Sequence, residues 1–186
     1  MMRLVELRKA GVTAATMSRM ERAGEVIRLS RGVYQLPDAD MDPNHSLAQA
    51  AKRVPKGVVC LVSALAFHGL TDQLPPMVWM AIGPKDWAPQ HSGAGIRIVR
   101  FTDSLLREGF ETHTIEGVPV KVFGAAKTVA DCFRHRGKVG PSVAIEGLQE
   151  ALRQRKATPA DIARQADKGG VSTVIRPYLE ALTANA

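Results

Sequence analysis

The sequence has only two cysteines, few aromatic residues and no long apolar run. Cys60 and Cys132 stand in apolar surroundings without a second cysteine nearby, so we expect buried small side chains in a reducing compartment rather than a disulfide framework. No segment has the length of apolar sequence that spans a bilayer, and the N-terminus lacks the pattern of a signal peptide. We therefore expect a cytoplasmic protein with no membrane partner.

The sequence also lacks the pattern of a metal or cofactor site. Gly93 and Gly95, and likewise Gly137 and Gly140, do not lead from a strand into a helix as a phosphate-binding loop does. The five histidines are scattered without the spacing of metal ligands: His45, His68, His91, His113 and His135. We expect no metal, no cofactor and no catalytic residue.

What the chain does contain is basic charge in a globular composition. Its 186 residues are 45% hydrophobic and 23% charged, which is ordinary for a protein with a sizeable core. The formal net charge is +7 and the isoelectric point is near 9.8. These values favour a polyanionic partner and argue against an acidic protein.

Residues 13–24 predict a short basic helix. At 100° per residue Met17 and Met20 face a core, whereas the other side is small, hydroxylated and cationic. Thr13 can cap the helix start, and Gly24 can end it in the left-handed conformation. Such a surface suits a DNA major groove, where arginine pairs with guanine or phosphate and an alanine methyl contacts thymine. The predicted DNA contacts of this helix are Thr13, Ala15, Ser18, Arg19 and Arg22.

Residues 26–36 predict a β-hairpin after this helix. Ser30-Arg31-Gly32 fits a three-residue loop whose glycine is left-handed, between two β-type runs. Arg31 would lie at the tip, within reach of a phosphate or a narrow minor groove. The predicted contacts of this wing are Arg28, Arg31 and Tyr34.

Residues 2–10 predict a helix ahead of the basic one, with Leu4 and Leu7 at helical spacing. Helix, turn, helix and hairpin make up most of a winged helix-turn-helix domain over residues 1–36. Such domains normally carry one more helix ahead of this pair, and Met1 leaves no room for it. Either the start lies further upstream, or the module is minimal and is covered by another part of the chain or by a second subunit.

Plain solvation is the simpler interpretation of any single arginine, but seven basic against three acidic residues in 1–36 favour nucleic-acid binding.

Residues 37–44 hold three aspartates, two prolines and no basic residue, which predicts an acidic linker. Residues 45–186 are the second predicted domain, with 18 basic and 12 acidic residues. We expect helices over 45–53, 125–135, 142–155, 159–167 and 172–183, with a helical tendency at 63–67. Strands are expected over 77–82 and 96–101, and a hairpin over 111–115 and 118–123. The predicted fold class is α+β: a winged helix-turn-helix, then a mixed domain with a small β-sheet and a helical C-terminal half.

Four segments carry a resemblance to a known family. They are Arg28-Leu29-Ser30-Arg31-Gly32-Val33-Tyr34, Leu61-Val62-Ser63-Ala64-Leu65, His68-Gly69-Leu70-Thr71-Asp72 and Ala126-Lys127-Thr128-Val129-Ala130-Asp131-Cys132-Phe133-Arg134. Together they resemble the AbiEi-type antitoxins of type IV toxin–antitoxin systems over nearly the whole chain. The resemblance implies a DNA-binding domain that represses its own operon and a second domain that counteracts a nucleotidyltransferase toxin in phage defence. It requires no direct contact with the toxin, because type IV antitoxins can act on the toxin's target or its consequences.

A candidate functional surface of the second domain comprises Lys127, Asp131, Arg134 and Arg136. Simpler interpretations are a salt bridge between Lys127 and Asp131, one helical turn apart, and cations that suit the end of a helix. His68, beside Phe67, is expected to be a hydrogen-bonded histidine of a packed helix rather than a ligand or base.

The favoured function is a non-enzymatic autorepressor and antitoxin that binds double-stranded DNA at an inverted repeat in its own promoter, as a homodimer. One alternative is a metal-dependent nuclease using Asp131 and Glu146, which ranks lower because these carboxylates lack a supporting lysine at a suitable spacing. Another is a ligand-sensing regulator without a toxin partner, which shares the first domain and differs in what residues 45–186 recognise.

Overall fold

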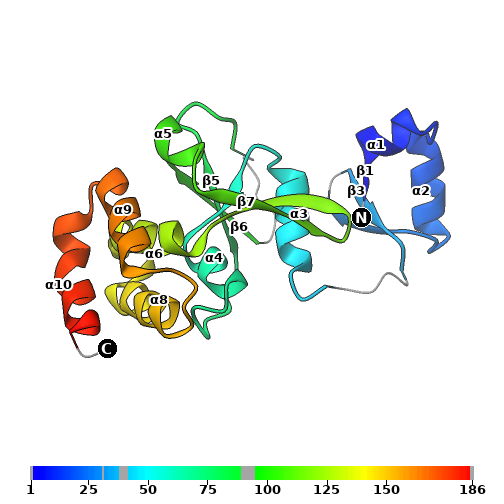
Figure 1. The fold of residues 1–186 in the computed structure, drawn as a ribbon. Helices are drawn as coiled ribbons and strands as arrows, with labels where there is room; N and C mark the ends of the chain where they lie inside the picture. The colour runs from blue at the N-terminus through cyan, green and yellow to red at the C-terminus, as the bar shows by residue number, and fades with distance from the viewer. Residues whose placement is uncertain (1, 31, 38–41, 89–94, 185–186) are drawn as a thin grey trace.

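The computed structural model describes residues 2–30, 32–37, 42–88 and 95–184. A small N-terminal sheet with two helices lies at one end of the molecule, a larger sheet lies in the middle, and the last helices form the other end (Figure 1). The fold is mixed α and β, which confirms the predicted α+β class.

The N-terminal region runs β1 (Met2–Arg3), α1 (Leu4–Lys9), α2 (Ala14–Arg22), β2 (Ile27–Ser30) and β3 (Val33–Gln35). Its strands form an antiparallel sheet in the order β1-β3-β2. The helix predicted over 2–10 is therefore too long at its start. Met2 and Arg3 pair with Tyr34 and Val33 instead, because β3 has a free edge there that accepts a short strand.

The ends of α2 follow the chemistry expected from the sequence. Thr13 accepts a hydrogen bond from the Thr16 N–H at 3.1 Å and so caps the helix start. Gly24 has φ +74°, the left-handed conformation that ends a helix at low cost for glycine. Gly32 has the same φ at the end of the hairpin turn, as predicted. The predicted three-residue loop is wrong at its start, because Ser30 belongs to β2 and pairs with Val33.

The larger sheet has five strands in the order β6-β5-β4-β8-β7. The strands are β4 (Val58–Val59), β5 (Val78–Ile82), β6 (Ile96–Arg100), β7 (Phe110–Ile115) and β8 (Val118–Phe123). The predicted hairpin is confirmed as the antiparallel pair β7–β8, turning at Glu116 and Gly117. The pairs β4–β8 and β5–β6 are parallel, a long-range arrangement that no local sequence pattern indicates.

Helices cover both faces of this sheet. On one face α3 (His45–Arg53) packs against strand residues such as Met80 and Val120. On the other, α4 (Leu61–Phe67) and α6 (Ala125–Arg134) pack against Trp79 and Phe123. Adjacent strand residues face opposite clusters because side chains alternate along a strand. Beyond α6 lie α8 (Pro141–Arg153), α9 (Pro159–Gly169) and α10 (Ser172–Thr183), and the short helices are α5 (Asp103–Leu106) and α7 (Arg136–Val139).

The larger part of the molecule makes polar contacts with Asp42, at the end of the 37–44 segment, and with Glu6 of the N-terminal region. Glu116 Oε1 accepts from the Asp42 N–H at 3.0 Å, and both oxygens of Glu116 lie 2.9 Å from His45 Nδ1. Lys52 of α3 pairs with Glu6 of α1 at 2.6 Å. The remaining residues of the predicted acidic linker, 38–41, lie outside the described part of the chain.

Candidate nucleic-acid interface

Helix α2 has one buried side and one open side. Met17 is 2% exposed and packs with Val26 and Tyr34, while Met20 is partly buried against the same cluster. The helix therefore presents its predicted inner face inward. The predicted outer residues are all exposed: Ala15, Ser18, Arg19 and Arg22.

Three cationic side chains of this region have no partner among the described residues. The guanidinium groups of Arg19, Arg22 and Arg28 make no hydrogen bond, ion pair or ring contact there. Arg28 is exposed on β2, one element after the helix. A guanidinium with no internal partner keeps all five of its donors for an external acceptor such as phosphate.

Thr13 is exposed, but its hydroxyl is engaged. It accepts from the Thr16 N–H and lies 2.9 Å from the Thr16 hydroxyl. Its position at the N-terminus of α2 also places it where a helix attracts anions. Arg31, the predicted tip of the wing, lies outside the described residues.

Tyr34 does not lie on the interface as predicted. Its side chain is 8% exposed and belongs to the small apolar cluster with Met17 and Val26. All three residues of β3 are buried, since this strand is the centre of the N-terminal sheet and both of its edges are paired. The prediction of a DNA contact from Tyr34 is therefore wrong, and the side chain supports the helix from behind.

The candidate surface of the second domain is also wrong in part. Lys127 and Asp131 are 4% and 2% exposed, and Lys127 Nζ lies 3.0 Å from Asp131 Oδ2. The Lys127 ammonium also lies 4.4 Å from the centre of the Phe123 ring. Burial raises the pKa of Asp131, and the neighbouring Lys127 opposes that rise. The simpler interpretation, a helical salt bridge, is confirmed, and the pair belongs to the core.

The two arginines of that candidate surface are placed differently from each other. Arg134 is partly buried, with one guanidinium nitrogen that has no hydrogen-bond partner among the described residues. Arg136 is exposed and donates to the Phe133 carbonyl at 3.1 Å. The four residues therefore do not form one open surface.

The carboxylates named for a nuclease have separate partners. Glu146 accepts from the Thr71 hydroxyl at 2.8 Å and from the Asp72 N–H at 3.3 Å, whereas Asp131 pairs with Lys127. Within the described ranges, no group of three or more histidine, cysteine or acidic side chains could hold a metal ion. His68 Nε2 lies 2.7 Å from the Phe123 carbonyl, and burial lowers the pKa of His68, as suits a structural histidine.

Two cavities in the larger part of the molecule are small. One of about 100 Å³ lies beside α3, and one of about 160 Å³ lies among Phe133, Arg136, Val174 and Tyr178. Sites for small molecules usually have about 300 to 1,000 Å³. Neither cavity favours the ligand-sensing alternative. None of the helices that the structure describes is long and apolar enough to cross a membrane.

A comparison with known protein families gives a match in the N-terminal region, which contains the candidate interface. Residues 3–37 match the family described as "Transcriptional regulator, AbiEi antitoxin". The resemblance to the AbiEi antitoxins is thereby confirmed over α1, α2 and the hairpin. No curated protein matches the chain.

Among solved structures, the chain is similar to the Rv2827c protein from Mycobacterium tuberculosis. The TM-score is 0.58 at 16% sequence identity, and the match covers 96% of this chain and 72% of that one. At this identity the likeness concerns the fold, and it extends over both the AbiEi segment and the larger sheet with its helices.

Sequence reasoning missed two features of the larger part. One is Glu116, whose carboxylate accepts a hydrogen bond from the Asp42 N–H and lies within hydrogen-bond distance of His45 Nδ1. The sequence indicated only a turn at this position. The other is Trp87, which is 71% exposed in the loop after β5. The sequence signal for Trp87 was a tryptophan within Gly83-Pro84-Lys85-Asp86-Trp87-Ala88-Pro89, a run whose glycine and prolines indicate a loop.

Proposed function

We propose that this protein is a DNA-binding transcriptional autorepressor and the antitoxin of a type IV toxin–antitoxin system, counteracting a nucleotidyltransferase toxin. The observation that carries the DNA-binding half is the open face of α2: Arg19 and Arg22 are exposed and without a protein partner beside the small residues Ala15 and Ser18. The family matched by residues 3–37 is one of transcriptional regulators, which supports the same reading.

The topology supports a winged helix-turn-helix over residues 1–36. The order of strand, helix, turn, helix and hairpin, with β1 joining the hairpin as an outer strand, is that of such a domain from its first strand onward. In this arrangement α2 is the recognition helix and the β2–β3 hairpin is the wing. Arg28 would contact the phosphates next to the groove that α2 enters.

The antitoxin half rests on the family match and on charge. Residues 45–186 carry 18 basic and 12 acidic residues, so the second domain adds to the attraction for a polyanion. We propose that two copies bind the two halves of an inverted repeat, because one α2 reads only a few base pairs. The second domain would then oppose the toxin without an enzymatic step of its own.

Binding to the DNA upstream of the gene tests the first half. Arg19→Ala and Arg22→Ala should each weaken binding by about tenfold, and each should lower the dependence of log affinity on log salt by about one. Arg176→Ala is the matched control, since Arg176 is an exposed cation of α10 at the other end of the molecule. Operator binding that survives the double variant Arg19→Ala/Arg22→Ala would remove α2 from the interface.

Co-expression with a neighbouring nucleotidyltransferase gene tests the second half. The wild-type protein should relieve the growth arrest. No relief by the full chain would contradict the antitoxin assignment. Cleavage of DNA in the presence of magnesium, lost in Glu146→Gln, would favour the nuclease instead.

A further inference from the structure

The loop after β5 exposes a tryptophan, Trp87, whose side chain makes no hydrogen bond or ring contact with the described residues. The chain has two tryptophans, and they lie in opposite environments. Trp79 is 6% exposed within the core, under the guanidinium of Arg97 at 4.1 Å. Trp87 is 71% exposed. Leaving a large aromatic side chain in water forgoes a large burial of apolar surface, so an outward Trp on an ordered loop suggests an external partner.

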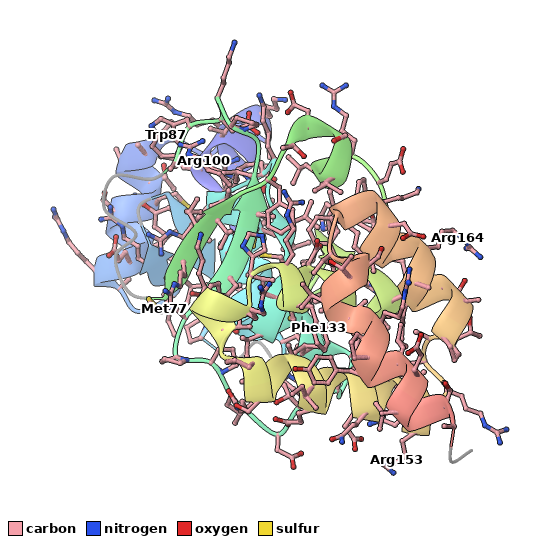
Figure 2. The ribbon with its side chains drawn as sticks, turned by 90° about the vertical axis from the view of Figure 1, so that its left-hand side faces the viewer. Met77, Trp87, Arg100, Phe133, Arg153 and Arg164 are labelled. Atoms are coloured by element: carbon pink, nitrogen blue, oxygen red, sulfur yellow. The ribbon has the colours of Figure 1, made fainter. Side chains whose placement is uncertain are left out.

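This loop is held in place by specific hydrogen bonds. Arg100 Nη1 donates to the carbonyls of Gly83 and Pro84, each at 2.8 Å, and to that of Asp86 at 3.1 Å. The Asp86 carboxylate accepts from the Gly83 N–H at 2.9 Å. Figure 2 shows Trp87 and Arg100 at the same corner of the molecule. These hydrogen bonds fix the backbone of residues 83–86, directly before Trp87.

The residues on either side of Trp87 anchor the loop further. A Cβ on Gly83 would lie 2.8 Å from Asp86 Oδ2 and 3.2 Å from Asp103 Oδ1, so glycine allows the loop to close on itself. Ala88 packs against the apolar cluster that α3 covers. Between these two anchors, the indole is the largest exposed side chain.

Two exposed lysines accompany the indole. Lys85 precedes it by two residues and is exposed. Lys56 is 82% exposed, and its Nζ lies 3.5 Å from Asp86 Oδ1, which places it beside the same loop. Asp86, which precedes the indole in the sequence, already accepts from the Gly83 N–H and pairs with Lys56, so its carboxylate is engaged within the loop.

We propose that Trp87, Lys56 and Lys85 form a binding site for single-stranded nucleic acid. An unpaired base would stack on the Trp87 ring, and the lysines would bind the phosphates on either side of it. Stacking on an exposed aromatic together with flanking cations is how proteins bind single strands without sequence preference. In a duplex the base faces are covered by their neighbours, and insertion would first require unstacking. The observations therefore favour a single strand over duplex DNA.

This site does not depend on α2. It draws on residues 83–88, which follow β5 and are held by Arg100 of β6, with Lys56 from the segment after α3. The double variant Arg19→Ala/Arg22→Ala should lose duplex operator binding and keep binding of a single strand. Failure of one proposal can thus be told apart from failure of the other.

Tryptophan fluorescence of the full chain provides the test. Titration with a single-stranded oligonucleotide of about 12 nucleotides, as DNA and as RNA in separate arms, should quench the emission of Trp87 and leave that of buried Trp79. In Trp87→Phe the quenching should vanish because only Trp79 still emits. Binding of a labelled strand, followed by anisotropy, should weaken about tenfold or more in Trp87→Ala and remain within about threefold in Trp87→Phe, which keeps a stacking ring.

The lysines give a second readout. Lys56→Ala and Lys85→Ala should each lower the slope of log affinity against log salt by about 0.7, the value for a single-strand phosphate contact. Single-strand affinity unchanged in Trp87→Ala, or equal quenching by the matched duplex, would overturn the proposal. A flat titration with both strands, together with self-association that Trp87→Ala abolishes, would overturn it too and assign the loop to a protein contact.

Discussion

Residues 2–35 and residues 45–184 bury apolar side chains on different scales. The N-terminal region has a single small cluster of Met17, Val26 and Tyr34, with a few partly buried neighbours. The larger region has two extensive clusters, one on each face of a five-stranded sheet. A segment of this size rarely holds its fold alone without a disulfide, a metal or another surface to pack on. We infer that the N-terminal region depends on the rest of the chain, on a second copy or on DNA for part of its stability.

The two regions also treat charge in opposite ways. In the larger region Lys127 and Asp131 are buried as a pair, whereas the arginines of α2 stay exposed and unpaired. Removing one partner of a buried ion pair destabilises the fold strongly, although the intact pair contributes little net stability. An exposed cation stays hydrated, so it carries no such desolvation penalty and can still bind an external partner. Lys127 and Asp131 therefore serve the fold of the larger region from within its core, whereas the arginines of α2 remain available for recognition.

The largest expected effect comes from breaking the buried pair. Lys127→Ala leaves the Asp131 carboxylate without its partner in the core and should lower the free energy of unfolding by about 3 to 5 kcal/mol. The double variant Lys127→Met/Asp131→Leu removes both charges and should unfold within about 1 kcal/mol of wild type. Urea denaturation followed by far-UV circular dichroism measures both. If the single variant were as stable as the double one, the pair would not be buried as described.

A core substitution in the small region separates the two regions. Met17→Ala should cost about 2 to 5 kcal/mol and unfold the N-terminal region, because its cluster has few other members to close the cavity. Amide exchange should then rise across α1 and α2 while α6 and α8 stay protected. Val5→Ala is the control, since Val5 is 60% exposed. Equal loss of protection in both regions would show that they unfold as one unit.

Acid should weaken the larger region through His135. Its ring packs 5.1 Å from Phe101, and burial together with Lys138 and Arg134 lowers the pKa of His135 to about 4 from its ordinary 6.5. The unfolded chain therefore binds a proton that the folded chain does not, and stability falls as the pH drops from 6.5 towards 4. Allowing for the exposed part of the ring, we expect a loss of about 1 to 2 kcal/mol.

The comparison of His135→Gln with wild type at pH 7 and at pH 5 isolates this residue. The variant should lose less stability than the wild type between the two values, as judged by the urea midpoint. Parallel losses in both proteins would assign the acid sensitivity to other groups.

Local patterns predicted the helices better than any other feature. The helices over 45–53 and 172–183 have the predicted bounds, because apolar periodicity and local end signals suffice to place them. The caps of α2 at Thr13 and Gly24 followed for the same reason. The order of the strands in the larger sheet could not be predicted from local patterns, since the parallel pairing of Val59 with Val122 joins residues far apart in the chain.

Burial was harder to predict than secondary structure. Lys127 and Asp131 look like surface residues by type, and only the pairing partner one turn away hinted that both could be buried. Tyr34 was placed on the wing because alternation does not tell which face of a short strand is covered, and β3 is buried throughout. The DNA contacts assigned to α2 and Arg28 remain predictions, with the exposure that such a role requires.

The smallest expected effect concerns the contact between the two regions. Burial alone would raise the pKa of Glu6, but hydrogen bonds from the Arg3 N–H and from Lys52 lower it below its ordinary value. Lys52→Gln removes the ion pair between Lys52 of α3 and Glu6 of α1, and it keeps the hydrogen bond from the Arg3 N–H to Glu6. It therefore tests the contact between the two regions without disturbing the start of α1. The Lys52 side chain is 10% exposed and that of Glu6 44%, so we expect this partly open pair to contribute about 1 kcal/mol. We expect slightly faster amide exchange in α1 and α2 and no change in the larger region.

The stabilisation by the Glu6–Lys52 pair depends on pH, and the lowered pKa of Glu6 sets the direction of that dependence. Because the folded pKa of Glu6 is lowered, the stabilisation is present above its unfolded value of 4.5 and is lost as the pH falls below it. The exchange difference between wild type and Lys52→Gln should therefore be present at pH 7 and shrink below about pH 4.5. A difference that persisted in acid would mean that Lys52 supports the N-terminal region through packing of its long side chain against α1 rather than through its charge.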